Sequence, residues 1–514
     1  MGKSGETRVA IVGGGISGLA AAKQLAWLKP TVFEATESIG GVWRHCAYRT
    51  TRLQTPRPDY EFSDHPWADR ADPTFPTSTE ILDYLDGYAD RFQLRDFIKL
   101  NSKVVEIRYL GSPEKDAFAA QWAGTAQRHS PANLSGRSGW SPENRALFRV
   151  FDNIIHRDVH RKIRRSPEDA GFSVGRGPEI FQGKVMHTLD YCKLDEEATK
   201  ELMRGKKVVI LGYKKSAIDL AVECAEANQG PDGEPCTMVI RTLHWTVPSY
   251  SIWGLPFFLF YSTRLSQFLH ERPNQGLLRS LLCLFLAHWR GVSKFIESYL
   301  TWKLPLEKYG LKPDHPFDED YASCQMAILP ENFFAEADRG LIRFEKSSRW
   351  CFWEKGVVLD DGTKLEADIV FLATGFDGKK KLRSVLPEPF RGLIEDSNGG
   401  HDPPSDSAHG VHRVHRERVE PPHVGATVQV AGEAAGGRFE LPTVEGMVRQ
   451  TNEETEVMKR TTRFYRRHCI STFSIDHSDE ICAEMGWKPW RKGNWLSEIF
   501  SPYSNQDYKA DKSD

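Results

Sequence analysis

Three glycines near the start of the chain have the spacing of a turn that binds the phosphates of a dinucleotide. They are Gly13, Gly15 and Gly18, and they follow the apolar run Val9–Val12. The first glycine permits a tight turn, the second lets a pyrophosphate approach the backbone, and the third lets the next helix pack against the strand. The N–H groups and the positive end of that helix then bind the phosphate charge. The residues expected at this first site are Gly13, Gly14, Gly15, Ile16, Ser17 and Gly18.

Two neighbouring features support this interpretation. A second strand-like run, Thr31–Phe33, ends at Glu34, about twenty residues after Gly13, where an acid is expected to bind a ribose hydroxyl. Gly41 and Trp43 belong to a further small-residue segment that we expect beside the bound cofactor. The alternative is a glycine-rich turn with a surface glutamate, but strand, turn, helix, strand and acid occur in the expected order.

A second strand–turn–helix pattern begins at Lys207–Gly212. It departs from the glycine spacing because Lys214 occupies the position of the middle glycine. The next strand, Thr237–Ile240, ends at Arg241, and a guanidinium there suits a 2′-phosphate, which favours NADP over NAD. The alternative is an ordinary surface arginine. The residues expected at this second site are Gly212, Tyr213, Lys214, Lys215, Ser216, Ala217 and Arg241.

The elements that must position these turns indicate an α/β fold with two Rossmann-like dinucleotide-binding domains. A chain of 514 residues is too long for one compact core, which agrees with two or three domains. We predict a helix at Ser78–Gln93 with Ser78 as its N-cap. We also predict a hairpin turn at Asp361-Gly362, a helix at Glu453–His468 and a disordered tail at residues 505–514.

The composition excludes several classes of protein. The formal net charge of −2 gives no reason to expect a nucleic-acid partner. The nine cysteines contain no CxxC pair, which argues for reduced thiols and a cytoplasmic location, and against zinc or a redox dithiol. No apolar run reaches the roughly 18 residues that a membrane span needs. The apolar runs Trp253–Tyr261 and Leu277–Trp289 indicate a buried helix or channel wall, with peripheral membrane contact as the alternative.

Two stretches, Arg128–Gly177 and Arg391–Gly437, show little periodicity. The first contains the basic run His156–Arg165, which we interpret as a solvated loop and not as a phosphate site. In the second, histidines recur every third residue, but the surrounding prolines and glycines argue against a rigid metal site. We therefore expect no metal. These histidines are His409, His412 and His415.

The residues between the two turns carry a more specific motif. Phe181, Gly183, His187 and Tyr191 form the pattern FxGxxxHxxx(Y/F), and Ala373–Phe376 follows the last strand-like run. With the two turns, these motifs resemble the class B flavin-dependent monooxygenases. The resemblance covers residues 8–127, 178–390 and about 436 onward. Further segments resemble the plant subgroup that includes a pipecolate N-hydroxylase of systemic acquired resistance: Trp253–Phe258, Glu307–Pro313, Tyr321–Met326 and Cys469–Ile475.

This resemblance implies an enzyme with two cofactors. FAD would lie on the first turn, with Glu34 at its ribose, and NADPH on the second turn, with Arg241 at its 2′-phosphate. The NADP-binding domain, at 201–365, would be inserted in an FAD-binding domain made of residues 1–200 and 366–514.

The resemblance also implies the reaction. NADPH reduces FAD, and one oxygen atom of O2 is transferred to a soft nitrogen or sulfur nucleophile, most closely the N-hydroxylation of pipecolic acid in plant defence. The family often has an asparagine beside the reacting oxygen. Gln54 falls at that position and is the candidate catalytic residue, because its amide can still donate a hydrogen bond. His187 and Tyr191 are expected to pack and orient the motif and not to transfer protons. Peripheral association with the endoplasmic reticulum is an open alternative for the location.

The chain departs from the family in the two irregular stretches. The family usually has an apolar strand ending in Thr-Gly before the motif, and no threonine occurs between Ala126 and His187. Two abrupt losses followed by full recovery suggest an altered reading frame or splicing. An inactive, non-catalytic relative is therefore one alternative function. A Baeyer–Villiger enzyme, whose motif ends in tryptophan instead of Tyr191, and an indole-pyruvate type monooxygenase are others.

Overall fold

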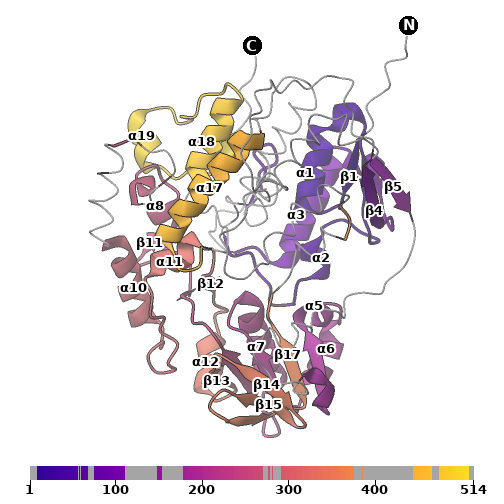
Figure 1. Cartoon of the computed structure of the whole chain (residues 1–514), viewed down its shortest axis with the longest axis vertical. Coiled ribbons are helices and arrows are strands. Elements are labelled where there is room, and N and C mark those ends of the chain that lie inside the picture. The colour runs from indigo at the N-terminus through magenta and orange to yellow at the C-terminus, as the bar shows by residue number, and fades with distance from the viewer. Residues whose placement is uncertain are drawn as a thin grey trace, which may run out of the picture.

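The computed structural model shows two larger parallel sheets with a helical region beside them (Figure 1). The residues described are 9–55, 57, 60–67, 75–109, 148–152, 177–269, 272, 276–277, 281, 291–375, 384–386, 444–465 and 474–508. The sheets contain three and five strands, and in each sheet one strand leads directly into one of the glycine turns. This arrangement confirms the predicted α/β class.

The first sheet has the order β1-β2-β3, all parallel, which is half of a dinucleotide-binding sheet. Its core brings Leu19 of α1 and Val32 of β2 against Ile81 and Leu85 of α3. An antiparallel ribbon, β4–β5, follows. The elements are β1 (Ala10–Val12), α1 (Ile16–Gln24), β2 (Thr31–Phe33), α2 (Val42–His45), α3 (Ser78–Arg91), β3 (Ile98–Lys99), β4 (Val104–Tyr109) and β5 (Phe148–Asp152).

Helix α3 confirms the predicted helix but corrects its cap. Thr77, not Ser78, is the N-cap: its hydroxyl accepts a hydrogen bond from Glu80 N at 3.2 Å, and the Glu80 carboxylate accepts one from Thr77 N at 2.9 Å. This reciprocal pair is a capping box, which needs the acid three residues after the cap. Glu80 has that spacing from Thr77 and not from Ser78.

The second sheet has the strand order β13-β8-β7-β17-β6, and its strands pair in parallel. Helix α7 packs on it and is buried along most of its length. Strands β6 and β17 lie outside residues 201–365, so the sheet crosses both boundaries expected for the NADP domain. The elements are β6 (Lys184–His187), α5 (Thr188–Tyr191), α6 (Glu196–Met203), β7 (Val208–Leu211), α7 (Lys215–Ala227), β8 (Cys236–Ile240), α12 (Phe333–Asp338), β13 (Ile342–Lys346) and β17 (Ile369–Leu372).

An antiparallel three-stranded unit covers the second sheet and contains the predicted hairpin. Strand β15 pairs with β16 through the Asp361-Gly362 turn, where Gly362 has φ +86°. A side chain would be strained at this φ, so the turn needs glycine. The strands are β14 (Trp350–Trp353), β15 (Gly356–Leu359) and β16 (Lys364–Glu366).

A helical region joins β8 to β13 and meets the C-terminal helices, drawn in yellow in Figure 1. It is centred on stacked rings, with Tyr261 and Tyr321 only 3.5 Å apart at their centroids. The elements are β9 (Thr246–Val247), β10 (Ser251–Ile252), β11 (Leu255–Pro256), α8 (Phe258–Tyr261), α10 (Gly291–Lys303), α11 (Phe317–Ala322), β12 (Ala327–Ile328), α17 (Val444–Thr461), α18 (Ser474–Glu484) and α19 (Trp495–Phe500).

The C-terminal part differs from two predictions. Helix α17 begins nine residues before the predicted start at Glu453 and ends at Thr461, not His468. The tail is not disordered at Asn505–Tyr508, where a 3₁₀ helix docks on the first domain: Asn505 Nδ2 donates to Glu61 O at 2.6 Å. A buried amide that satisfies a main-chain carbonyl is a specific contact, which composition does not reveal.

Other predictions concern cysteines, membranes and the irregular stretches. Six cysteines in the described part of the chain are not in disulfides, but Cys324 is disulfide-bonded, so the expectation of reduced thiols is wrong there. No helix among the described residues could span a membrane. Apart from β5 and Gly177, residues 128–177 and 391–437 lie outside the described residues, and so do His409, His412, His415 and the basic run.

Candidate active site

The first glycine turn has the geometry that its spacing predicts. Gly13 has φ +102°, and its N–H donates to Phe33 O at 2.9 Å, which holds the turn against β2. A side chain at Gly18 would place its Cβ 1.8 Å from Gly13 O, so only glycine lets α1 pack this close. The tight turn and the close helix packing are therefore confirmed.

Two glycine segments approach each other beside this turn. A Cβ at Gly15 would lie 3.6 Å from Gly41 Cα, and Gly40 N donates to Gly14 O at 3.0 Å. Trp43 follows in α2 and meets Tyr60 edge-on at 5.9 Å. These segments form a backbone cradle with an aromatic side chain at one end.

The cradle fits a pyrophosphate. A Cβ at Gly13 would meet no atom within 4 Å, so the chain leaves space at the turn. Helix α1 begins after Gly15 with no acidic residue in its first turn and no capping side chain from the described residues. The N–H groups at the start of α1 are thus suited to bind an anion, with no acidic side chain in the first turn of the helix.

Glu34 contacts the turn itself. Its buried carboxylate accepts from Gly14 N at 2.7 Å through Oε2, and from Thr36 N at 3.0 Å and Thr36 Oγ1 at 2.8 Å through Oε1. A carboxylate has about four acceptor positions, and these three donors leave one for a ligand hydroxyl. From the sequence we predicted a contact with a ribose hydroxyl, but not these hydrogen bonds, which hold the turn in place.

The second turn is formed at the end of β7. Gly212 has φ +143°, and a Cβ there would lie 2.6 Å from Ala373 O. The side chains of Tyr213 and Ala217 are buried, so only the backbone at these two residues can face a ligand. Burial also raises the pKa of the Tyr213 phenol. Ser216 is half-buried.

The charged residues at this turn have different partners. Lys214 Nζ donates to Gln325 Oε1, and Lys215 Nζ binds Asp219 Oδ1 at 2.6 Å. Arg241 is exposed at the end of β8, and Leu211 pairs with Val239 in register. Gly212 and Arg241 therefore follow neighbouring strands at the same edge of the sheet, which is where a dinucleotide binds.

Gln54 lies where the first domain meets the second. Its exposed side chain accepts from Ile328 N of β12 at 3.4 Å through Oε1, and β12 pairs with β9 just after β8. Since that contact uses the amide oxygen, Nε2 keeps its donor function.

Glu223 of α7 holds the same loop and was missed by the sequence reasoning. Its Oε1 accepts from Thr50 N at 2.9 Å and from Thr50 Oγ1 at 2.8 Å, and its Oε2 accepts from the Tyr191 phenol at 2.6 Å. The nearby Arg49 pairs with Glu226, one turn further along α7. A buried acid in an apolar helix face was the only sequence signal.

The residues of the FxGxxxHxxx(Y/F) motif make structural contacts. His187 is the N-cap of α5, accepting from Leu189 N at 3.2 Å through Nδ1, and Tyr191 is buried against Phe371. A Cβ at Gly183 would lie 2.5 Å from Asp368 O, so glycine is required beside β17. These contacts agree with an orienting role.

The comparisons with known proteins identify the family. A family model described as flavin-binding monooxygenase-like matches residues 6–380. "Probable flavin-containing monooxygenase 1" of Arabidopsis thaliana is 52% identical over 527 aligned positions, which cover 98% of this chain and 96% of that protein. The chain belongs to the flavin-containing monooxygenase family. "Putative flavin-containing monooxygenase 2" of the same plant is 43% identical, covering 94% of this chain and 98% of that protein.

This flavin-containing monooxygenase is an NADPH-dependent flavoenzyme with FAD and NADPH as cofactors and a small molecule and O2 as co-substrates. Solved structures share its fold. A cyclohexanone monooxygenase has a TM-score of 0.55 at 16% identity and covers 93% of this chain and 99% of its own. The OTEMO complex with FAD and NADP has a TM-score of 0.56 at 16% identity, covering 98% and 96%.

Proposed function

We propose that this flavin monooxygenase transfers one oxygen atom from O2 to a soft nitrogen nucleophile, and that its substrate is pipecolic acid in plant systemic immunity. Support comes from the segments that resemble the plant N-hydroxylase subgroup and from 52% identity to the Arabidopsis relative. A cytoplasmic location, with peripheral contact with the endoplasmic reticulum, belongs to the same proposal.

In this proposal each of the two turns binds one cofactor. FAD is held by Gly13, Gly14, Gly15, Ile16, Ser17, Gly18, Glu34, Gly41 and Trp43. NADPH is held by Gly212, Tyr213, Lys214, Lys215, Ser216, Ala217 and Arg241. The glycine cradle and the helix start at α1 support the first set. The shared sheet edge of Gly212 and Arg241 supports the second.

The main support for the proposed reaction is the position of Gln54 where the two domains meet. Bound FAD supplies the redox and oxygen chemistry. The amide of Gln54, held through its oxygen by Ile328 N, is oriented to donate from Nε2 to the reacting oxygen. Glu223 fixes the loop that carries Gln54, so the donor is preorganised.

A second candidate is an inactive relative with an incomplete first sheet. Among the described residues, β1 is an edge strand, and its Val12 is 53% exposed. A central strand of such a sheet is normally covered on both faces. This exposure accords with a disturbed sequence at residues 128–177 and 391–437.

A coupling assay separates these functions. The FAD-loaded protein would be given NADPH and a panel of pipecolic acid, a thioether, a cyclic ketone and indole-3-pyruvate, with H2O2 release and product mass recorded. We expect pipecolic acid alone to suppress H2O2 release and to gain one oxygen. Coupled oxidation of the ketone or the indole acid would replace the proposal, and absence of flavin uptake would favour the inactive relative.

A further inference from the structure

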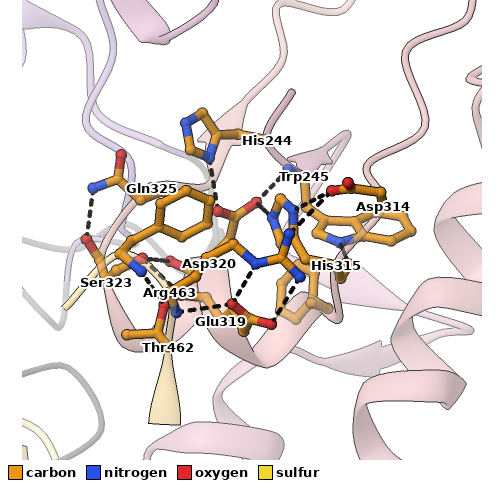
Figure 2. A network of polar contacts seen from close by, with 12 residues as sticks. His244, Trp245, Asp314, His315, Glu319, Asp320, Ser323, Gln325, Thr462 and Arg463 are labelled. Atoms are coloured by element: carbon orange, nitrogen blue, oxygen red, sulfur yellow. Dashed lines mark hydrogen bonds and ion pairs between the residues drawn. The ribbon is translucent and has the colours of Figure 1, made fainter. Parts of the chain in front are cut away.

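Asp320 of α11 lies at the centre of a buried polar network (Figure 2). Its side chain is 0% exposed. Oδ1 accepts from His244 Nδ1 at 2.7 Å, and Oδ2 accepts from Trp245 N at 2.6 Å and lies 2.9 Å from His315 Nε2. A buried carboxylate is tolerated only with such partners, so these contacts are specific.

The carboxylate holds the loop that follows β8. His244 comes three residues after Arg241, and both Asp320 oxygens contact this loop. Trp245 adds a second tie, because its indole Nε1 donates to His315 O at 2.8 Å. The position of Arg241 at the sheet edge therefore depends on a loop anchored at its other end by Asp320.

The main chain of Asp320 is linked to Lys214, a second cation expected to bind NADPH. Its carbonyl accepts from Gln325 N at 2.8 Å. The Gln325 side chain donates from Nε2 to Ser323 O at 3.0 Å and accepts from Lys214 Nζ through Oε1. The side chain of Asp320 thus holds the loop that follows Arg241, and its backbone is linked through Gln325 to Lys214.

The C-terminal region closes the network from the other side, as Figure 2 shows. Arg463 donates from Nε to Glu319 Oε2 at 2.9 Å, and Thr462 Oγ1 donates to Glu319 O at 2.9 Å. The ring of Phe464 lies 5.0 Å from the His244 ring and 5.1 Å from the His315 ring. These contacts shield the carboxylate from water.

The charges favour an ionised Asp320. Burial acts to raise its pKa, but the hydrogen bonds from His244 and His315 outweigh burial and lower it. The same three side chains offer metal-ligand atoms within 4.8 Å of one another. The N–H donors of His244 and Trp245 already satisfy the carboxylate, so hydrogen bonding accounts for this group without an ion.

We propose that Asp320 is a positioning residue for NADPH, which sets Arg241 for the 2′-phosphate and Lys214 for the pyrophosphate. The proposal rests on the assignment of the second turn to NADPH. It attributes part of the selectivity for NADPH over NADH to a residue that touches neither cofactor.

The test measures dissociation constants of NADP⁺ and NAD⁺ for the FAD-loaded protein, with flavin content as the control for folding. We expect Asp320→Asn to weaken NADP⁺ binding about tenfold and NAD⁺ binding much less. The reason is that Arg241 then loses its charged hydrogen bond to the 2′-phosphate, which NAD⁺ lacks. Flavin content stays unchanged. Asp314→Asn is the matched control: this carboxylate is 89% exposed, contacts His315 Nδ1 at 3.4 Å and leaves Asp320 intact, so selectivity should persist.

A double variant shows whether the effect passes through Arg241. If it does, Asp320→Asn adds little to the selectivity loss of Arg241→Ala. Additive losses, or an Asp320→Asn protein that keeps its selectivity, would overturn the proposal. Wild-type selectivity that is insensitive to Arg241→Ala would refute the assignment of the second turn instead.

The link through Gln325 gives an independent variant if Asp320→Asn does not fold. Gln325→Met removes the Lys214 contact and keeps the buried volume. We expect NADP⁺ and NAD⁺ to bind more weakly by the same factor, because both carry the pyrophosphate. Unchanged binding of both nucleotides would contradict the proposal.

Discussion

The Tyr191 phenol donates a 2.6 Å hydrogen bond to Glu223 Oε2, while Thr50 donates twice to Oε1 of the same carboxylate. The last residue of the FxGxxxHxxx(Y/F) motif is thereby joined to the loop that carries Gln54. Tyr191 and Glu223 are buried, and Thr50 is half-buried. The motif tyrosine thus acts through α7 on the opposite domain.

Tyr191→Phe removes one donor from this buried carboxylate. We expect the free energy of unfolding to fall by about 1–3 kcal/mol, because an acceptor is left without its partner. Urea unfolding would measure this loss, and the substrate preference should stay as in the wild type. A variant as stable as the wild type would show that the bond contributes little.

Gly15→Asp should abolish FAD binding, because it sets a carboxylate at the start of α1 against the pyrophosphate. Gly15→Ala controls for folding, because a Cβ there lies 3.6 Å from Gly41 Cα, an ordinary contact; its methyl group should weaken FAD binding less than the carboxylate does. The ratio of flavin to protein absorbance reports the result. Recovery of Gly15→Asp with full flavin would refute the assignment of this turn.

Gln54→Ala should uncouple the reaction. Loss of the donor is expected to lower product formation by roughly 100- to 1,000-fold, the range of losses for a single stabilising donor, while NADPH oxidation continues. Gln54→Asn keeps the amide on a shorter chain and should retain more product. The ratio of H2O2 to product measures the effect, and equal coupling in all three proteins would remove Gln54 from the site.

Asp219 predicts a pH dependence of stability. Burial raises its pKa from 3.8 to about 6, although Lys215 at 2.6 Å acts to lower it. The folded state therefore binds more protons than the unfolded state between these values. Below pH 3.8 this effect adds about 3 kcal/mol to the free energy of unfolding. That contribution is lost as the pH rises through about 6.

Asp219→Asn removes this titration, and urea unfolding at pH 4 to 7 provides the measurement. The stability of the variant relative to the wild type should rise across that interval. Parallel pH profiles for the two proteins would show that Asp219 titrates normally.

The docked C-terminus gives a truncation test. Removal of residues 505–514 deletes the hydrogen bonds from Asn505 to Glu61 O and from Gln506 to Phe62 O. We expect a loss of at least roughly 1–3 kcal/mol in unfolding free energy, because the Lys492–Asp507 pair and the buried Tyr508 are removed together with these two bonds. Removal of residues 509–514 keeps both and serves as the control. Equal thermal midpoints for the two truncated proteins would contradict the docking.

Local signals made much of this structure predictable. The glycine spacing indicated the turn at Gly13, the strand that ends in glycine indicated the turn at Gly212, and the Asp-Gly pair indicated the hairpin, because backbone geometry there depends on neighbouring residues alone. The capping box was also readable, since Glu80 stands three residues after Thr77. The expected N-cap at Ser78 overlooked that spacing.

Contacts between distant residues were not predictable. Glu223 meets Thr50 and Tyr191, and Asp320 meets His244 and His315, only because the fold brings separate elements together. A buried acidic residue leaves no periodic pattern in the sequence from which its partners could be predicted. The same reason explains the docked Asn505, which composition places in a tail.

Incorporation of labelled oxygen tests the proposed reaction most directly. The FAD-loaded protein would be incubated with NADPH, pipecolic acid and ¹⁸O₂ in ordinary water, and the product analysed by mass spectrometry. The proposal predicts N-hydroxypipecolic acid with one ¹⁸O atom, formed in step with NADPH oxidation. NADPH oxidation that yields only labelled H2O2, across all pipecolic acid concentrations, would contradict it.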